Sequence, residues 1–269
     1  MAKALWVYLI TGEFGLPEVY KPSRDVIELR KLYSQYRNMN KYLNMLKNNI
    51  QSVLLDDGIV LTSKDKKPLL SEKTGKEFLQ YLDITDASRI SIMVSLEILW
   101  KVIPQKEKLV KEIIRAGTPF KDKVKILISI KGITPLSALA FLADVGDIKR
   151  FKSVRKMNSY LGLVPKVKES ANKGKTCHIN KASRNLTRTI LTQSLIQAMD
   201  ASTYLRHSYE DTKTRRGSGR ARIGLIRKLC GIMRRMLLNG ELFRNVKMPL
   251  YEKKMKQFGH YRIFPRKLR

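Results

Sequence analysis

One serine stands in the most basic loop of the chain. The segment after Pro165 reads KVKESANKGKT, and Ser170 lies in it close to Lys168, Lys173 and Lys175. A serine hydroxyl becomes a useful nucleophile only when a base or a metal ion activates it, and lysines attract the phosphates of a nucleic acid. The segment is therefore expected to bind a nucleic-acid backbone and to present a hydroxyl nucleophile to it. The ordinary alternative is a solvated surface turn.

A basic helix is expected directly after this loop, over residues 181–199. It carries Lys181, Arg184 and Arg188 at spacings of three and four, which bring side chains to one face of a helix. A solvated charged face is the usual explanation of such a pattern, but the neighbouring lysine loop favours a shared anion surface. The other face is expected to pack into the core through Leu186, Ile190, Leu191, Leu195 and Ile196.

A tight glycine turn precedes the loop in the sequence. A helix is expected over residues 124–130, the turn holds Lys131 and Gly132, and Thr134 begins a second helix rich in alanine. This is the pattern of a helix-hairpin-helix, which points backbone N–H groups and a helix N-terminus at a phosphate without reading sequence. Lys131, Gly132 and Thr134 are therefore expected to contact DNA. An ordinary helical corner would show the same pattern.

The composition favours a polyanionic partner. The chain has 54 Lys and Arg against 23 Asp and Glu, a net charge of +31 and a pI near 10.2. A field of this sign attracts nucleic acid, with ribosomal-type or membrane-surface binding as alternatives. The hydrophobic content of 43% in 269 residues excludes a disordered tail.

Cysteine and histidine residues give no sign of a metal site. Cys177 and Cys230 stand far apart without a CxxC neighbour, so neither a zinc ribbon nor a disulfide framework is expected and a reduced, cytoplasmic compartment fits. His178 lies close to Ser170 but has no third ligand nearby. His207 and His260 are expected at the surface. No segment has the length and apolarity of a transmembrane helix.

Two long helices are expected to position the site. The first begins at Ser23, and its apolar residues recur in steps of three and four like a coiled-coil seam. The second covers residues 85–116, with Pro104 expected to kink it and Lys106 on its seam. The pair could form an antiparallel hairpin for dimerisation or spacing, and an intramolecular bundle is an equal alternative. The seam residues of the first helix are Leu29, Leu32, Tyr36, Met39, Leu43, Leu46, Ile50 and Val53.

The remaining segments are assigned more coarsely. A polar loop is expected at 64–68, a short helix at 73–82, a domain boundary at 117–119 and a helix at 221–239. Phe151, Met157, Tyr160, Leu161 and Leu163 should pack inward. The tail, 241–269, is basic with aromatic residues and is expected to order only on nucleic acid.

Several of these motifs together resemble a known family. They are an I-x-G-I hairpin, a G-x-I-x-R-F step, a Y-L-G-L-x-P turn, a serine in a small-residue loop, and an I-x-K helix start closed by Arg. In order and spacing they are similar to the C-terminal domain of transposases of the insertion sequence 110/116/902 family, relatives of the Piv-type DNA invertases. The positions are 130–133, 146–151, 160–165, Ser170, and 179–181 with Arg188.

The resemblance implies a mechanism. Members of the family are recombinases in which a RuvC-like domain of the ribonuclease H fold supplies acidic residues for a divalent metal such as Mg²⁺. The loop serine attacks DNA to form a phosphoseryl link, and some relatives use a guide RNA. Ser170 carries over as the nucleophile.

This sequence departs from the family pattern in two ways. The acidic set would lie upstream of the LPEVY segment at 16–20, and Glu13, Asp25 and Glu28 do not supply it. Within the site, Ala171 and Thr134 replace expected glycines, and Ser183–Arg184 replaces Gly-Asn. The expectation is an N-terminally truncated copy that is inactive alone.

The sequence thus predicts a mostly α protein, a long coiled-coil helical hairpin followed by a compact helical domain with a helix-hairpin-helix. The expected divisions are 1–22, a remnant of a RuvC-like domain; 23–118, the helical linker; 119–240, the transposase domain; and 241–269, the basic tail. The expected function is serine-dependent, metal-dependent transposition in the cytoplasm, near the nucleoid, by a homo-oligomer on DNA. The alternative is a non-catalytic dimeric DNA- or RNA-binding regulator.

Overall fold

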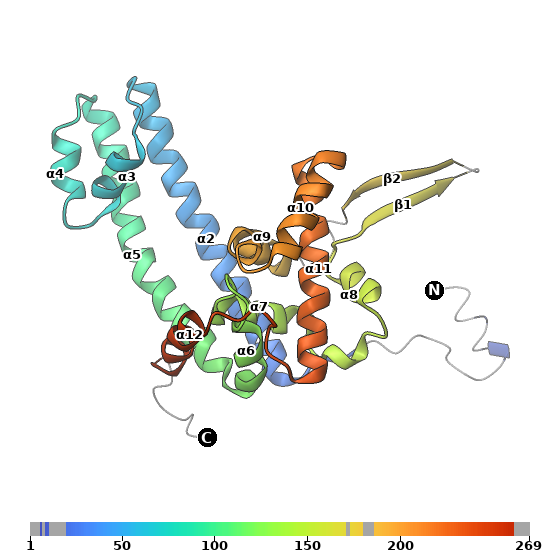
Figure 1. The fold of residues 1–269 in the computed structure, drawn as a ribbon. Coiled ribbons are helices and arrows are strands. Elements are labelled where there is room, and N and C mark those ends of the chain that lie inside the picture. Colours follow the sequence, from blue (N-terminus) through green and yellow to red (C-terminus); the bar gives the residue numbers. More distant parts are fainter. Residues whose placement is uncertain (1–5, 7–8, 11–19, 171–172, 180–185, 261–269) are drawn as a thin grey trace.

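The protein is mostly helical, with one two-stranded antiparallel sheet (Figure 1). The structure, a computed structural model, describes residues 6, 9–10, 20–170, 173–179 and 186–260. The elements are α2 Arg24–Asp56, α3 Ser63–Leu70, α4 Gly75–Gln80, α5 Asp86–Ala116, η1 Thr118–Phe120, α6 Lys121–Ile128, α7 Pro135–Val145, η2 Ile148–Arg150, α8 Val154–Tyr160, β1 Pro165–Ser170, β2 Lys173–Ile179, α9 Leu186–Met199, α10 Thr203–Arg216, α11 Ser218–Asn239 and α12 Met248–His260.

The two long helices predicted from the sequence are confirmed as α2 and α5, which pack along one another. Ser23 caps α2 by accepting from the N–H of Val26 at 3.5 Å, and Thr85 caps α5 by accepting from the N–H of Ser88 at 3.2 Å. Pro104 lies inside α5 without ending it. The buried stripe of α2 is Val26, Leu29, Tyr33, Leu43, Leu46, Ile50 and Leu54.

Two hydrophobic cores divide the described molecule. The smaller core joins the far ends of α2 and α5 with α3 and α4, through residues such as Leu96 and Leu99. The larger core combines the near ends of α2 and α5 with the helices from α6 onward. The boundary predicted at 117–119 falls at η1, but the larger core runs across it because Ile113 and Leu127 belong to the same cluster.

Three sequence-based assignments are wrong. The predicted polar loop at 64–68 lies in α3, which begins with a capping box between Thr62 and Asp65 and tolerates Pro68 near its end. The basic loop after Pro165 is the β1–β2 hairpin. Residues 248–260 of the tail form α12, which packs on the larger core through Phe258.

α9 and the inward-packing residues largely follow prediction. Leu191 and Leu195 of α9 are buried, but Ile196 is 70% exposed because it lies on the other side of the helix from Ser194 and Ala198. Of the inward-packing set, Phe151, Met157, Leu161 and Leu163 are buried, and Tyr160 is partly buried. Through the described part of the chain, no helix is long and apolar enough to cross a bilayer.

Candidate nucleic-acid interface

The β1–β2 hairpin carries the predicted nucleophile at the end of its first strand. It projects from the helical body in Figure 1. Ser170 is paired with Lys173, and Lys168 with Lys175. Positions two apart share a face of a strand, and directly opposed positions share a face of the sheet. The register therefore places positions 168, 170, 173 and 175 on one face, with Glu169 and Gly174 on the other.

The start of α9 is tied to the turn that leads into the hairpin. Arg188, in the first turns of α9, is half-buried, and its Nη1 donates to the carbonyl of Gly162 at 3.4 Å. Gly162 has a φ of +65° in the Y-L-G-L-x-P turn, a conformation that favours glycine. Arg188 thus holds together the segments on both sides of the hairpin, so its predicted DNA contact would be made by a side chain that also supports structure.

A buried carboxylate fixes the beginning of α9. Asp144 is 2% exposed near the end of α7, and its Oδ2 accepts from both the N–H and the hydroxyl of Thr187, each at 2.8 Å. Negative charge at a helix N-terminus is favourable. On the other side, Arg30 of α2 donates to the backbone carbonyls of Ala143 at 2.7 Å and Asp144 at 3.2 Å. These hydrogen bonds join the long helix α2 to the end of α7, which in turn holds the start of α9 beside the hairpin.

The G-x-I-x-R-F step forms a second support. Gly146 has a φ of +68°, and a Cβ there would meet the Tyr20 hydroxyl oxygen at 2.7 Å, so only glycine fits. The Arg150 guanidinium carbon lies 4.1, 4.2 and 4.3 Å from the ring centroids of Tyr20, Phe151 and Tyr160. Such contacts are attractive cation–π interactions. They fix α8 and the approach to the hairpin.

The predicted helix-hairpin-helix turn lies at the other end of α9. Gly132 has a φ of +91° and is buried: a Cβ there would meet the Ser194 carbonyl oxygen at 2.8 Å. Lys131 Nζ lies 3.4 Å from Asp200 Oδ2. Thr134 is exposed and caps α7 by accepting from the N–H of Ser137 at 3.1 Å. Of these three predicted contacts, Gly132 is covered by α9, whereas Thr134 is open to a ligand.

The predicted DNA-binding residues therefore fall into two groups at opposite ends of α9. Asp200, beside Lys131, is twelve residues beyond Arg188, or roughly 18 Å at 1.5 Å per residue. Lys181 and Arg184 lie outside the described residues. His207 is at the surface as predicted, with its Nε2 3.5 Å from Asp211 Oδ2.

Sequence reasoning missed the residues that hold the hairpin in place. Arg30, Asp144 and Thr187 received no role, although an acid inside the apolar run ALAFLADV was a usable signal, because a buried carboxylate needs partners. Within the described residues, no three His, Cys, Asp or Glu gather to hold a metal ion.

Comparison with known proteins finds relatives of this part of the chain. Residues 124–210, from α6 into α10, match the family model "Transposase IS116/IS110/IS902 family". The chain is similar to the transposase for insertion sequence element IS1111A of Coxiella burnetii, with 33% identity over 126 residues, 43% of this chain and 33% of that protein. It is also similar to the putative transposase y4qE of Sinorhizobium fredii, with 36% identity over 65 residues, 24% of this chain and 17% of that protein.

A third relative is the probable family 20 transposase of Pseudomonas aeruginosa, 32% identical over 69 residues, 26% of this chain and 20% of that protein. The matched parts span a third or less of the length of these relatives. The hairpin and its supports in α7, α8 and α9 lie within the matched segment. Residues 124–210 are thus similar to transposases of the IS116/IS110/IS902 family, which confirms the resemblance seen in the motifs.

Proposed function

We propose that this chain acts in the transposition of an insertion sequence, with the β1–β2 hairpin as its DNA-contacting site and Ser170 as the nucleophile. The observation that carries the proposal is the register of the hairpin, which places positions 168, 170, 173 and 175 on one face. Lysines at directly opposed positions, such as Lys168 and Lys175, repel one another and destabilise a pair of strands. A phosphate bound between them would remove this repulsion. The hairpin face is thus suited to a phosphodiester held beside Ser170.

The proposed reaction is a transesterification. The Ser170 hydroxyl loses its proton, its oxygen forms a bond to phosphorus, and the bond from phosphorus to one sugar oxygen breaks. The leaving sugar oxygen takes up a proton. The phosphoseryl bond conserves the energy of the broken phosphodiester bond. Attack on this bond by another sugar hydroxyl would therefore join DNA and release Ser170 without an added energy source. Lysines at 168, 173 and 175 would offset the charge that builds up on the phosphate oxygens.

The divalent metal in this proposal is implied only by the resemblance to the transposase family. Mg²⁺ would activate the hydroxyl and stabilise the leaving oxygen. The described residues do not fit such an ion, since they contain no group of three possible ligands. We propose that a second polypeptide segment, one with an acidic cluster, holds the ion and completes the reaction.

Three finer features belong to the same proposal. The α6–α7 corner would act as a helix-hairpin-helix on a phosphate, through Thr134 and the start of α7. The α2–α5 pair would act as a coiled-coil spacer, and a guide RNA would share the basic surface. A homo-oligomer through the α2 seam is less supported, because Leu43, Leu46 and Ile50 pack in one cluster with Leu96 and Leu99 of α5 in the same chain.

The test is covalent capture of DNA by Ser170. Labelled duplexes tiled across the DNA flanking the gene are incubated with the chain and Mg²⁺, alone and with the IS1111A transposase supplied in trans. A denaturant-resistant adduct that maps to Ser170 is expected, and it should require the added protein. Ser170→Ala should abolish the adduct and retain DNA binding. Ser159→Ala, an exposed serine of α8, is the matched control and should leave the adduct unchanged.

The second candidate is the non-catalytic regulator, which the positive charge alone would support. Its signature is DNA or RNA binding with no adduct in either arm of the experiment. That result would contradict the nucleophile proposal. An adduct formed by the chain alone would instead contradict the need for a second acidic segment.

A further inference from the structure

A second basic surface lies at the corner between α10 and α11, apart from the serine hairpin. Between Asp211 and Glu241 the chain has no acidic residue. The corner itself is the single residue Gly217, with φ of 80°, and residues 213–220 are all exposed. The basic residues of this stretch are Lys213, Arg215, Arg216, Arg220, Arg222, Arg227, Lys228, Arg234 and Arg235.

Four arginines meet at this corner because α10 and α11 fold back on one another. Arg215 and Arg216 end α10, and Arg220 and Arg222 begin α11. All four are exposed. A cluster of this kind would repel itself if no anion were bound, so its exposure at a narrow corner needs an explanation beyond solubility.

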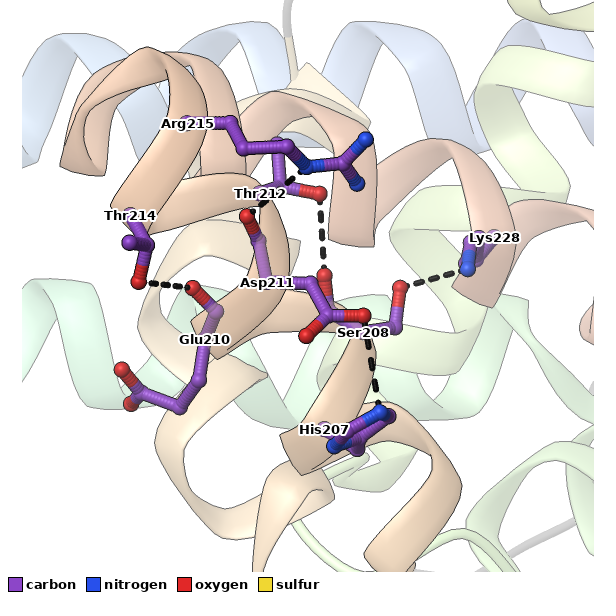
Figure 2. A network of polar contacts seen from close by, with 8 residues as sticks. All are labelled: His207, Ser208, Glu210, Asp211, Thr212, Thr214, Arg215 and Lys228. Carbon is purple, nitrogen blue, oxygen red and sulfur yellow. Dashed lines mark hydrogen bonds and ion pairs between the residues drawn. The ribbon is translucent and has the colours of Figure 1, made fainter.

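The nearest acids do not neutralise the cluster, and Figure 2 shows Asp211 directed at His207 while Arg215 contacts the backbone of Asp211. Glu210 pairs with Lys213 at 3.2 Å, and Asp211 lies 3.5 Å from His207. Arg215 donates through Nε to the backbone carbonyl of Asp211, not to its carboxylate. Within the described chain, none of the four guanidinium groups forms an ion pair.

Local stability does not account for the arginines of α11. The C-terminal turn of a helix favours cations, so Arg215 and Arg216 suit α10. The first turn disfavours them, yet the first turn of α11 holds Arg220, with Arg222 directly after it, and has neither an acid nor a side-chain cap. Replacing these two arginines should thus leave the stability of the helix unchanged or raise it, which fits residues kept for a ligand.

Farther along α11, the arginines on the side of Arg220 pack against α8 and are not part of the exposed surface. Arg220, Arg227 and Arg234 are seven residues apart, which places them on the same side of the helix. That side faces α8: a Cβ at Gly231 would lie 3.3 Å from Val154, and Arg234 donates to the carbonyl of Phe151 at 2.8 Å.

We propose that the α10–α11 corner, with Arg215, Arg216, Arg220 and Arg222, binds the sugar-phosphate backbone of a nucleic-acid double helix. The contact would be independent of base sequence, because it consists of guanidinium groups on phosphates. This surface extends the proposed function by one contact region, and it does not depend on Ser170 being a nucleophile. Its ligand could be either duplex DNA or a structured RNA, which present the same phosphodiester chemistry.

The test compares two sets of charge removal in the full chain carrying Ser170→Ala. One variant is Arg215→Gln, Arg216→Gln, Arg220→Gln and Arg222→Gln. The matched control is Lys64→Gln, Lys67→Gln, Lys73→Gln and Lys76→Gln, four exposed lysines at the far end of the molecule. Binding to a 20-base-pair duplex of DNA and to one of RNA is measured by fluorescence anisotropy between about 50 and 200 mM salt.

The corner variant should lose more than tenfold in affinity, and the slope of log affinity against log salt should fall by about three to four. The control should lose much less, because its lysines act only through the long-range field. If the corner variant loses affinity for only one of the two duplexes, that nucleic acid is the ligand. If it loses affinity for both, the result supports a contact to the backbone that DNA and RNA share. Equal loss in the two variants, or none in either, would overturn the proposal.

Folding is monitored separately. The melting temperature of the corner variant should stay close to that of the parent chain, because α10 loses two favourable C-terminal charges while α11 loses unfavourable N-terminal ones. If it falls, the pair Arg220→Gln and Arg222→Gln is tested alone against Lys64→Gln and Lys67→Gln. The proposal fails if that folded pair binds as tightly as its control.

Discussion

Asp144 is a carboxylate inside the most apolar helix of the chain. It is 2% exposed, its Oδ2 accepts two hydrogen bonds from Thr187, and its backbone carbonyl accepts one from Arg30. A buried carboxylate is stable only when its partners are in place. Its position therefore couples three distant stretches of sequence, and the start of α9 depends on it.

Asp144→Ala should lower the free energy of unfolding by about 2–4 kcal/mol, because the N–H and hydroxyl of Thr187 lose their acceptor in a buried site. Chemical denaturation followed by circular dichroism measures the change. Asp122→Ala is the control, since Asp122 forms only an exposed pair with Lys125 and should cost less than about 0.5 kcal/mol. Equal effects of the two substitutions would show that the Asp144 contacts contribute little.

Gly132 illustrates what spacing alone does not resolve. A glycine between two helices is typical both of a phosphate-binding turn and of a close packing contact. The contact that decides its environment comes from Ser194, more than sixty residues away in sequence. The conformation of Gly132 was thus predictable from the sequence, whereas its burial by α9 was not.

At the scale of elements, α12 joins the C-terminal part of the chain to the α6–α7 corner. Lys254 of α12 is 8% exposed, and its Nζ donates to the carbonyls of Ile128 and Ile130, each at 2.8 Å. These carbonyls lie at the end of α6, directly before the glycine turn. Burial lowers the pKa of Lys254 from 10.5 to about 8, since it disfavours the charged form.

This pKa predicts how stability depends on pH. Between about pH 8 and pH 10.5 the unfolded chain binds more protons at Lys254 than the folded chain does. The contribution of Lys254 to the free energy of unfolding therefore rises with pH across this window and is lowest below pH 8. Urea denaturation from pH 7 to pH 10 should show this rise in the wild type and its absence in Lys254→Met.

Lys253→Met is the control for that series, because Lys253 is exposed on the same helix. Its stability should follow the wild-type dependence on pH. The series stops at pH 10 because burial also raises the pKa of Tyr33 above its ordinary value, which acts in the opposite direction at higher pH. Parallel curves for all three proteins would refute a lowered pKa at Lys254.

The elements differ in how visible they are in the sequence. α2 and α5 show a cap and a long apolar period, so their starts at Ser23 and Thr85 were predictable. The β1–β2 hairpin has lysines and small residues where alternating apolar side chains would mark a strand. In α12, many basic residues surround Lys254 and Phe258, so the sequence does not mark these two as buried. For α3, the one usable sequence signal was the capping box at Thr62.

At the scale of the whole molecule, the two separate cores predict two levels of local stability. α2 and α5 connect the cores, but the far end with α3 and α4 has its own small cluster. Leu96→Ala should destabilise that end by about 2–5 kcal/mol, because Leu96 is fully buried there. Hydrogen exchange followed by mass spectrometry should show faster exchange in α3 and α4 and unchanged protection in α7 and α9.

Val94→Ala is the matched control on the same helix, since Val94 is 52% exposed, and it should change exchange little. DNA binding should be the same in both variants. If Leu96→Ala accelerated exchange across α7 and α9 to the same degree, the two cores would form a single cooperative unit, contrary to their separation here.

The aromatic enclosure of Arg150 also has a mechanical consequence. Tyr20 stands just before α2, yet its hydroxyl accepts from the N–H of Asp147 at 3.1 Å and its ring covers Arg150. Arg150 in turn donates through Nε to the carbonyl of Val145 at 3.1 Å. A pulling force on the backbone ahead of Tyr20 would therefore load the corner between α7 and α8 in parallel with the first turn of α2. Because α8 leads into β1, tension or torque entering at Tyr20 has a short, stiff route to the base of the serine hairpin.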